Sequence, residues 1–184
     1  IEFTGLPVQM DENLQLQVTI VDGANAYVID QNNSTFTTLG EDQGFTFNTP
    51  CSVVVLNTFT IILDTETGGW VISTPNNALT YPPLDNVPTI ESQLTTALSL
   101  ETLNDNLYIF GSTGIERWET NYGTNNFLFP FNRDSNFRTD YGAVSTQCVI
   151  RGIDRIYFLS SNFLPMALTP KGMMYLSTDG SALT

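Results

Sequence analysis

Two kinds of residue in this chain could do chemistry, its carboxylates and its arginines. A glycoside hydrolase needs two acids about 5 to 10 Å apart. The candidate acids are Asp64, Glu66, Glu116 and Asp154. A sialidase also needs clustered arginines to hold a substrate carboxylate. Five arginines lie within one third of the chain, at Arg117, Arg133, Arg138, Arg151 and Arg155. A carbohydrate-binding or sialidase-like protein is therefore an alternative that the sequence leaves open.

Calcium is the metal that the remaining acids could bind, because oxygen ligands can converge where turns meet. The candidate ligands are Asp22, Asp30, Asp64 and Glu66. An aspartate in a turn more often accepts hydrogen bonds from its own backbone. We therefore expect these carboxylates to be structural, with no metal ion and no cofactor bound.

Histidine is absent from the chain. Its absence removes the Ser-His-Asp and Cys-His nucleophile systems and the commonest ligand of transition metals. The sequence also has no Walker-type loop, no GxGxxG after a strand and no CxxC motif. We predict that the protein is not an enzyme and has no catalytic residue.

The charge balance argues against two classes of partner. Nineteen acidic residues outweigh six basic ones, which gives a net charge of −13. Affinity for phosphates comes largely from Lys and Arg, so we expect no specific binding of nucleic acid. The same charge disfavours anionic membranes, and no apolar run reaches 18 residues, so we expect no membrane insertion.

Cys51 and Cys148 stand among apolar or small residues, and we expect both thiols to be buried.

A repeated hairpin pattern organises the chain: an apolar run, a turn and a second apolar run. The four copies are "VTIVDGANAYVID" (18–30), "FTIILDTETGGWVIS" (59–73), "LYIFGSTGIERWE" (107–119), and "RIYFLSSN" with "GMMYLS" after a longer insert (155–177). The last apolar residue before the turn is Val21, Leu63, Phe110 and Leu159 in order, at steps of 42, 47 and 49 residues. Units of this length are typical of four-stranded propeller blades.

Turn residues and strand formers support the same fold. The predicted turns are Asp22-Gly23, Gly68-Gly69 and the loop from Gly111 to Gly114, where glycine tolerates a positive φ. One segment, 90–103, fits either a helix or a loop leading into a strand. We predict an all-β chain, a β-propeller or part of one, with consecutive antiparallel hairpin-based blades of about 40–50 residues. We expect residues 1–184 to form a single propeller segment, a fragment of a longer chain.

Four stretches resemble, in the same order, the propeller region of a known phage family. They are "VTIVDGANAYVID", "GWVISTPNNALTYPPLD", "NLYIFGSTGIERWE" and "FLFPFNRDSNFRTDYGAVSTQCVI". The family comprises the packaged-DNA stabilisation proteins of short-tailed phages, also described as tail accessory or tail-hub proteins. The similarity runs from about Leu14 to Tyr175, and its most telling part is the run from Asn106 to Gly142.

The resemblance implies a virion structural protein at the head–tail junction, made in the host cytoplasm. Such proteins form a homo-oligomeric ring below the portal, seal it after DNA packaging, stabilise the packaged genome and connect tail components. The implied partners are the portal or adaptor and other tail proteins. No catalytic residue belongs to the family's pattern.

The expected propeller fold assigns roles to the residues of the third hairpin (107–119). We expect its apolar residues Leu107, Ile109, Ile115 and Trp118 to pack between blades. Glu116 and Arg117 are then structural or interfacial rather than catalytic.

An arginine-bearing loop, "FPFNRDSNFRTDYG" (129–142), is the candidate assembly contact. One interpretation is a loop held by its own Arg–Asp pairs. The other is a contact with a neighbouring subunit, because interfaces favour arginine and aromatic anchors. The candidate residues are Phe131, Arg133, Phe137 and Arg138.

Overall fold

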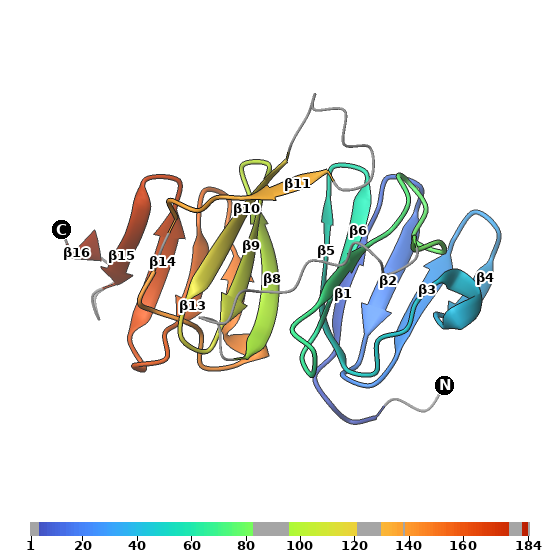
Figure 1. Cartoon of the computed structure of the whole chain (residues 1–184), viewed down its shortest axis with the longest axis horizontal. Coiled ribbons are helices and arrows are strands. Elements are labelled where there is room, and N and C mark those ends of the chain that lie inside the picture. The colour runs from blue at the N-terminus through green and yellow to red at the C-terminus, as the bar shows by residue number, and fades with distance from the viewer. Residues whose placement is uncertain (1–3, 83–95, 121–129, 138, 177–181, 184) are drawn as a thin grey trace. The chain divides into compact units, whose positions relative to one another are not determined.

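Short antiparallel strands make up almost all of the regular structure. The computed structural model describes residues 4–82, 96–120, 130–137, 139–176 and 182–183. Their strands form four antiparallel sheets, which follow one another along the chain (Figure 1). The helical elements in these ranges are the 3-10 turns η1 (Glu41–Gln43) and η3 (Thr146–Cys148). The predicted all-β architecture is confirmed. Nothing helical in the described ranges has the length and apolarity to span a membrane.

Each sheet is a meander in which strands consecutive in sequence pair with one another. The first sheet contains β1 (Gln9–Glu12), β2 (Gln17–Val21), β3 (Ala26–Asp30) and β4 (Thr35–Thr38). The second contains β5 (Pro50–Leu56), β6 (Phe59–Asp64) and β7 (Trp70–Ile72). The third contains β8 (Ala97–Leu103), β9 (Asn106–Gly111), β10 (Ile115–Thr120) and β11 (Phe131–Arg133). The fourth contains β12 (Val149–Arg151), β13 (Ile156–Leu159), β14 (Pro165–Thr169), β15 (Gly172–Leu176) and β16 (Ala182–Leu183).

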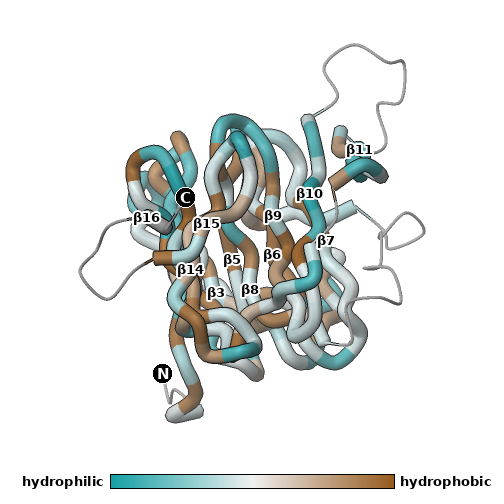
Figure 2. Tube along the Cα trace, turned by 90° about the vertical axis from the view of Figure 1, so that its left-hand side faces the viewer, coloured by the Kyte–Doolittle hydropathy of each residue, from teal (hydrophilic) through white to brown (hydrophobic). Residues whose placement is uncertain are grey.

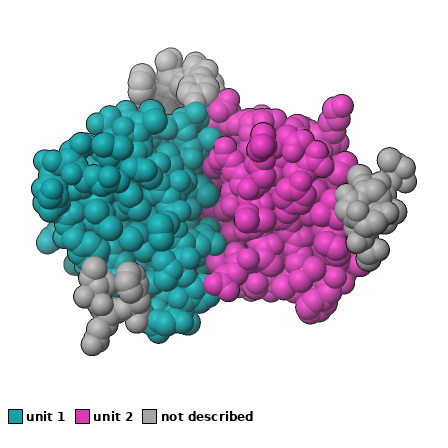
Figure 3. Space-filling view, turned by 180° about the vertical axis from the view of Figure 1, so that it is seen from behind, with its two compact units in different colours: residues 1–90 teal, residues 91–184 magenta. Residues whose placement is uncertain are grey.

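The chain divides into two compact units, residues 1–90 and residues 91–184 (Figure 3). Unit 1 holds the first two sheets and unit 2 the last two. Figure 2 shows hydrophobic stretches along strands such as β6 and β9. The two units therefore repeat one plan, a pair of meander sheets with apolar side chains between them.

The core of unit 1 lies between its two sheets. Val21, Ala26 and Val28 of the first sheet form one cluster with Val53, Ile62 and Val71 of the second. The first strands of the two sheets also contact each other through polar groups. Ser52 Oγ donates to Gln9 Oε1 over 2.7 Å, and the Val55 backbone N–H donates to Asp11 Oδ2 over 2.6 Å. Both apolar packing and polar side chains thus join neighbouring sheets.

Unit 2 has the same arrangement. Its core cluster combines Leu103, Tyr108, Phe110 and Ile115 of the third sheet with Val149, Ile156, Phe158, Met166 and Leu168 of the fourth. The first strands are again linked, because Arg151 Nη1 of β12 donates to Thr102 Oγ1 of β8 over 2.7 Å. In both units the equivalent strands contact each other across the interface, as adjacent blades of a propeller do.

The predicted hairpin turns are confirmed. Asp22-Gly23 lies between β2 and β3, and Gly68-Gly69 lies between β6 and β7. The third turn starts at Gly111, the last residue of β9, and ends at Gly114, before β10. Gly23 and Gly68 have φ of 82° and 65°, the left-handed region in which glycine is favoured. The fourth hairpin differs from the prediction, because its insert contains β14, which pairs with β13 before β15 follows.

Two further predictions can be compared with the structure. Residues 97–103 form β8, so the loop-and-strand interpretation of 90–103 is confirmed for the part that lies in the described residues.

The two cysteines are partly exposed rather than fully buried. Cys148 lies next to a 3-10 turn, where its thiol contacts the Ser145 carbonyl. Burial of the Cys51 side chain raises the pKa of its thiol to about 11.

Candidate assembly surface

The third hairpin presents two different faces because its residues alternate in direction. Ile115 pairs with Phe110 across the ladder, and Trp118 pairs with Leu107. Ile115, Phe110 and Tyr108 belong to the core cluster shared with the fourth sheet. Leu107, Ile109 and Trp118 are also buried, on the opposite face. Of the four residues expected to pack between blades, Ile115 is confirmed in the core of unit 2, together with Tyr108 and Phe110, which were not predicted. For Leu107, Ile109 and Trp118 the packing partners stay a prediction.

Glu116 is buried beside Trp118 on that opposite face. Its carboxylate accepts a hydrogen bond from Trp118 Nε1 over 3.1 Å. The guanidinium Nε of Arg133 lies 3.8 Å from the other carboxylate oxygen. Arg133 reaches this position because β11 pairs with β10 and places it opposite Trp118. Glu116 thus holds the hairpin and the following strand together, which supports its structural interpretation.

Arg117 anchors the arginine-bearing loop from the other face of β10. It forms an ion pair with Asp134, and Glu119 lies 3.3 Å from the same guanidinium nitrogen. Its guanidinium carbon also lies 5.1 Å from the centre of the Phe137 ring, a cation–π geometry. The backbone N–H of Asn136 and then Arg117 lower the pKa of Asp134, although desolvation opposes them. The loop is therefore held by an Arg–Asp pair whose arginine comes from the preceding strand.

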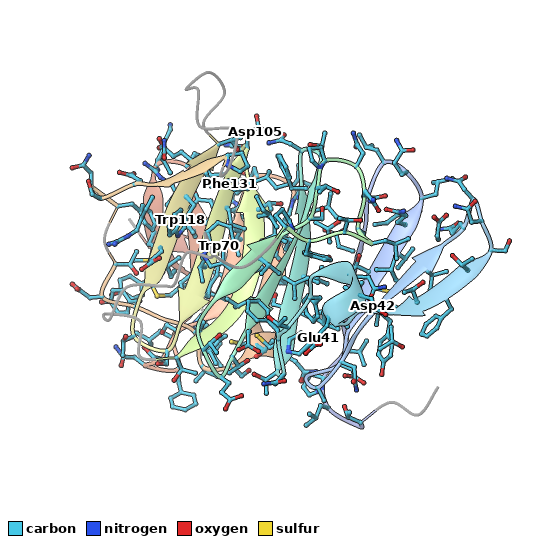
Figure 4. All side chains as sticks on the ribbon, turned by 45° about the vertical axis from the view of Figure 1, so that its right-hand side comes forward. Glu41, Asp42, Trp70, Asp105, Trp118 and Phe131 are labelled. Carbon is cyan, nitrogen blue, oxygen red and sulfur yellow. The ribbon has the colours of Figure 1, made fainter. Side chains whose placement is uncertain are left out.

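The four predicted assembly residues fall in different environments. Phe131 is 2% exposed on β11, next to β10 with Trp118 (Figure 4). Arg133 and Phe137 are half-buried, and the Phe137 ring packs edge-on against Tyr108. Arg138 lies outside the described residues. A buried Phe131 cannot serve as an exposed apolar anchor, so Arg133 and Phe137 are the described members that a neighbouring protein could reach.

Sequence reasoning missed the role of Arg117 in this loop. It considered pairs between the loop's own arginines and aspartates, Asp134 among them. The missing information was the register of β10 and β11, which brings residues 117 and 134 together: the backbone N–H of Asp134 donates to the Arg117 carbonyl over 2.9 Å. A sequence contains no direct signal of this register, because the two strands are separated by ten residues.

Two of the calcium candidates, Asp22 and Asp30, are engaged close to their own turns. Asp22 Oδ1 accepts from the backbone N–H groups of Ala24 and Asn25, over 3.1 and 2.7 Å. Asp30 does the same for Asn32 and Asn33. Each of these carboxylates stabilises the backbone of a turn, the role that the sequence favoured over calcium binding.

Asp64, the last residue of β6, links the following turn to Thr49, the residue before β5. One of its oxygens accepts from the backbone and hydroxyl of Thr49, and the other from those of Thr67. Burial alone would raise the pKa of Asp64, but these hydrogen bonds lower it. The carboxylate is therefore held in its charged form by four donors.

The described arginines of unit 2 have separate partners. Arg117 pairs with Asp134, Arg133 lies near Glu116, Arg155 pairs with Asp154, and Arg151 bonds to Thr102. A sialidase instead directs its arginines at one substrate carboxylate. The geometry of the described arginines therefore does not support the carbohydrate-active alternative.

A family model matches most of the chain. It is described as "Bacteriophage P22 Gp10, beta-propeller", and the match covers residues 4–167. None of the curated proteins compared with the chain matches it.

Several solved structures share the fold at low sequence identity. The N-terminal domain of Nup159 is 13% identical with a TM-score of 0.51, over 98% of this chain and 54% of that one. YCF48 from Cyanidioschyzon merolae is 10% identical with a TM-score of 0.54, over 99% and 63%. A putative exported protein from Bacteroides fragilis is 12% identical with a TM-score of 0.54, over 100% and 50%. These likenesses concern the fold alone, and the chain spans about half to two thirds of the length of each.

Proposed function

Because the chain belongs to the bacteriophage P22 Gp10 β-propeller family of phage DNA-stabilisation proteins, we propose that it closes the portal after DNA packaging and keeps the genome inside the head. In this proposal the protein forms a homo-oligomeric ring at the head–tail junction. The ring contacts the portal or adaptor on one side and carries further tail proteins on the other. Its place in the virion is therefore structural.

The family match is the observation that carries this proposal, since it spans both units of the chain. The packing within each unit is a second support. Each unit has a continuous apolar core, and polar links join the first strands of its sheets. A module packed in this way suits a plug that closes a channel.

The net charge of −13 suggests how such a plug would act. A surface with six basic residues offers few contacts to phosphates. The proposed ring would therefore retain the genome mechanically, by closing the channel, and not by adhesion to DNA.

The experiment that tests the proposal uses DNA-filled heads that lack this protein. Purified full-length protein is added, and the DNA that remains protected from a nuclease is measured. We expect protection to rise to the level of complete particles, and particles to acquire tail components afterwards. Heads that keep their DNA equally well without the protein would contradict the sealing role. Normal retention with failed tail addition would restrict the role to a connector.

A further inference from the structure

Positive charge is confined to the second half of the chain. Residues 1–90 contain ten acids and no Lys or Arg. Residues 91–140 contain seven acids and three bases, and residues 141–184 contain two acids and three bases. The net charges of these segments are −10, −4 and +1. Unit 1 is therefore strongly acidic, whereas the segment that includes the fourth sheet has a small positive charge.

Two turns of the fourth sheet carry its basic residues. Consecutive strands of this sheet are antiparallel, so the β12–β13 and β14–β15 turns lie at the same end of it. Arg151 is the last residue of β12, Lys171 lies in the β14–β15 turn, and both are exposed. Arg155 is neutralised by two hydrogen bonds to the adjacent Asp154, so Arg151 and Lys171 provide the excess positive charge. We call these two turns the basic end.

The basic end also presents an apolar side chain to solvent. Ile153 stands in the β12–β13 turn and is fully exposed. Its burial against a partner would remove apolar surface from water, which favours association. Neighbouring blades of a propeller pack face to face, so a further sheet would cover a face of the fourth sheet and leave its turns accessible. The basic end can therefore meet another molecule however many sheets the propeller contains.

Unit 1 offers acids that are complementary to the basic end. Glu41 and Asp42 lie side by side in η1, between β4 and β5, and both are exposed (Figure 4). No ion pair with a Lys or Arg of unit 1 is possible, because residues 1–90 contain neither. Asp22 and Asp64 are buried instead, and donors of their own turns hold them. We call Glu41 and Asp42 the acidic turn.

The segment charges decide which surfaces of two copies attract each other. Two copies of unit 1 bring −10 against −10, and two basic ends also bring like charges together. The basic end is attracted by both acidic segments, and more strongly by unit 1, because its charge of −10 exceeds the −4 of residues 91–140. Complementary charges of this kind select the partner and the register of a contact. The favoured contact therefore joins two different surfaces.

We propose that the basic end of one copy binds the acidic turn of a second copy, with Arg151 and Lys171 facing Glu41 and Asp42. Ile153 becomes buried in the same contact. Because the two surfaces differ, the contact is head-to-tail, and contacts of this type form rings when the rotation closes. This inference rests on the ring in the proposed function and names one of its contacts.

A charge exchange between two variants of the full-length protein tests the contact. The first variant carries Glu41→Lys with Asp42→Lys, and the second carries Arg151→Glu with Lys171→Glu. We expect each variant alone to self-associate about tenfold more weakly than the wild type in analytical ultracentrifugation, because like charges then meet. An equimolar mixture should recover the association, since each copy then meets an opposite charge on another molecule. A mixture that associates no better than its components would overturn the inference.

The charge exchange requires that the variants fold, which their thermal midpoints report. Arg151→Glu also removes the hydrogen bond to Thr102. Lys171→Glu alone leaves that bond intact and should weaken self-association in the same direction, by about threefold. Unchanged association of folded Lys171→Glu would contradict the contact.

Two neutralised acids separate this contact from general repulsion between acidic copies. Asp42→Asn and Asp105→Asn each remove one exposed negative charge, and Asp105 lies in the β8–β9 turn of unit 2 (Figure 4). General repulsion predicts stronger self-association for both variants. We expect Asp42→Asn to weaken it by about threefold and Asp105→Asn to leave it equal or stronger. Strengthening by both variants would refute the contact, whereas a wild-type protein that retains DNA as a monomer would refute the ring itself.

Discussion

Gly142 approaches the backbone of Gly111 so closely that a Cβ atom on Gly142 would overlap the Gly111 carbonyl oxygen and the following peptide. The next residue continues the contact, because the Ala143 N–H donates to that carbonyl over 2.8 Å. Ser161 N–H in turn donates to the Gly142 carbonyl over 2.9 Å. One glycine thus joins the turns of the third and fourth sheets.

We predict that Gly142→Ala destabilises the protein by about 1–3 kcal/mol, because backbone atoms must move to admit the methyl group. The free energy of unfolding can be measured with urea. Gly40→Ala is the matched control, since a Cβ there would meet a single flexible glutamine atom at 4.0 Å. Equal free energies of unfolding for the two variants would show that the backbone around Gly142 and Gly111 can move apart without loss of stability.

The ion pair between Arg117 and Asp134 gives a second prediction. Their side chains are 25% and 10% exposed, so solvent screens the pair less than an ordinary surface pair. A double-mutant cycle with Arg117→Met and Asp134→Asn should give a coupling energy of about 0.5–1 kcal/mol. The pair Arg155–Asp154, whose aspartate is 66% exposed, is the control and should show weaker coupling. A stronger coupling in the control would contradict the loop-anchoring role of Arg117.

Acid should destabilise the protein through Asp64. Its pKa in the folded protein lies below the ordinary value of 3.8, so the unfolded chain binds a proton more readily. The stabilisation is therefore complete well above pH 4 and is lost as the pH falls through the folded pKa. Asp64→Asn should lower the thermal midpoint at pH 7 and flatten its fall between pH 5 and pH 3. A variant with the same pH profile as the wild type would assign the acid sensitivity to other groups.

The fold was predictable because its signals are local. Alternating apolar runs and turn glycines such as Gly23 and Gly68 predict hairpins without knowledge of the rest of the chain. β14 was missed because its sequence "PMALT" begins with a proline. Proline usually ends a strand pattern, but here Pro165 pairs at the first position of the strand.

The candidate surface was less predictable because it depends on register and backbone strain. Phe131 and Phe137 look alike in the sequence, yet the first is buried on β11 and the second is half-buried in the loop. Phe163, in the turn between β13 and β14, likewise has a positive φ of 58°, which the preferences of phenylalanine do not predict.

We predict no measurable affinity for duplex DNA at physiological salt. Six basic residues face nineteen acidic ones, and Arg117, Arg133 and Arg155 already lie beside carboxylates of their own chain. The dissociation constant should be weaker than about 10⁻⁴ M, the weak end of nonspecific DNA binding. Fluorescence anisotropy with a labelled duplex measures it. Micromolar binding with a steep salt dependence would show that adhesion contributes to genome retention.

The arginine-bearing loop gives the last prediction. Arg133 and Arg138 are the loop residues that would meet an acidic surface of a neighbouring subunit, with Phe137 beside them. The double variant Arg133→Ala with Arg138→Ala should reduce particle assembly, because it removes the attraction that an otherwise acidic subunit can offer. The thermal midpoint of the isolated protein should fall little, since Arg117 continues to hold Asp134.

Arg155→Ala is the control for this variant, because it removes an arginine whose partner is the adjacent Asp154. Assembly should be normal with the control and impaired with the double variant. If both variants assemble normally, the loop is structural and its arginines serve the hairpin alone. If the double variant loses assembly together with its thermal midpoint, the defect arises in folding, because the Arg133–Glu116 contact holds β11 against β10.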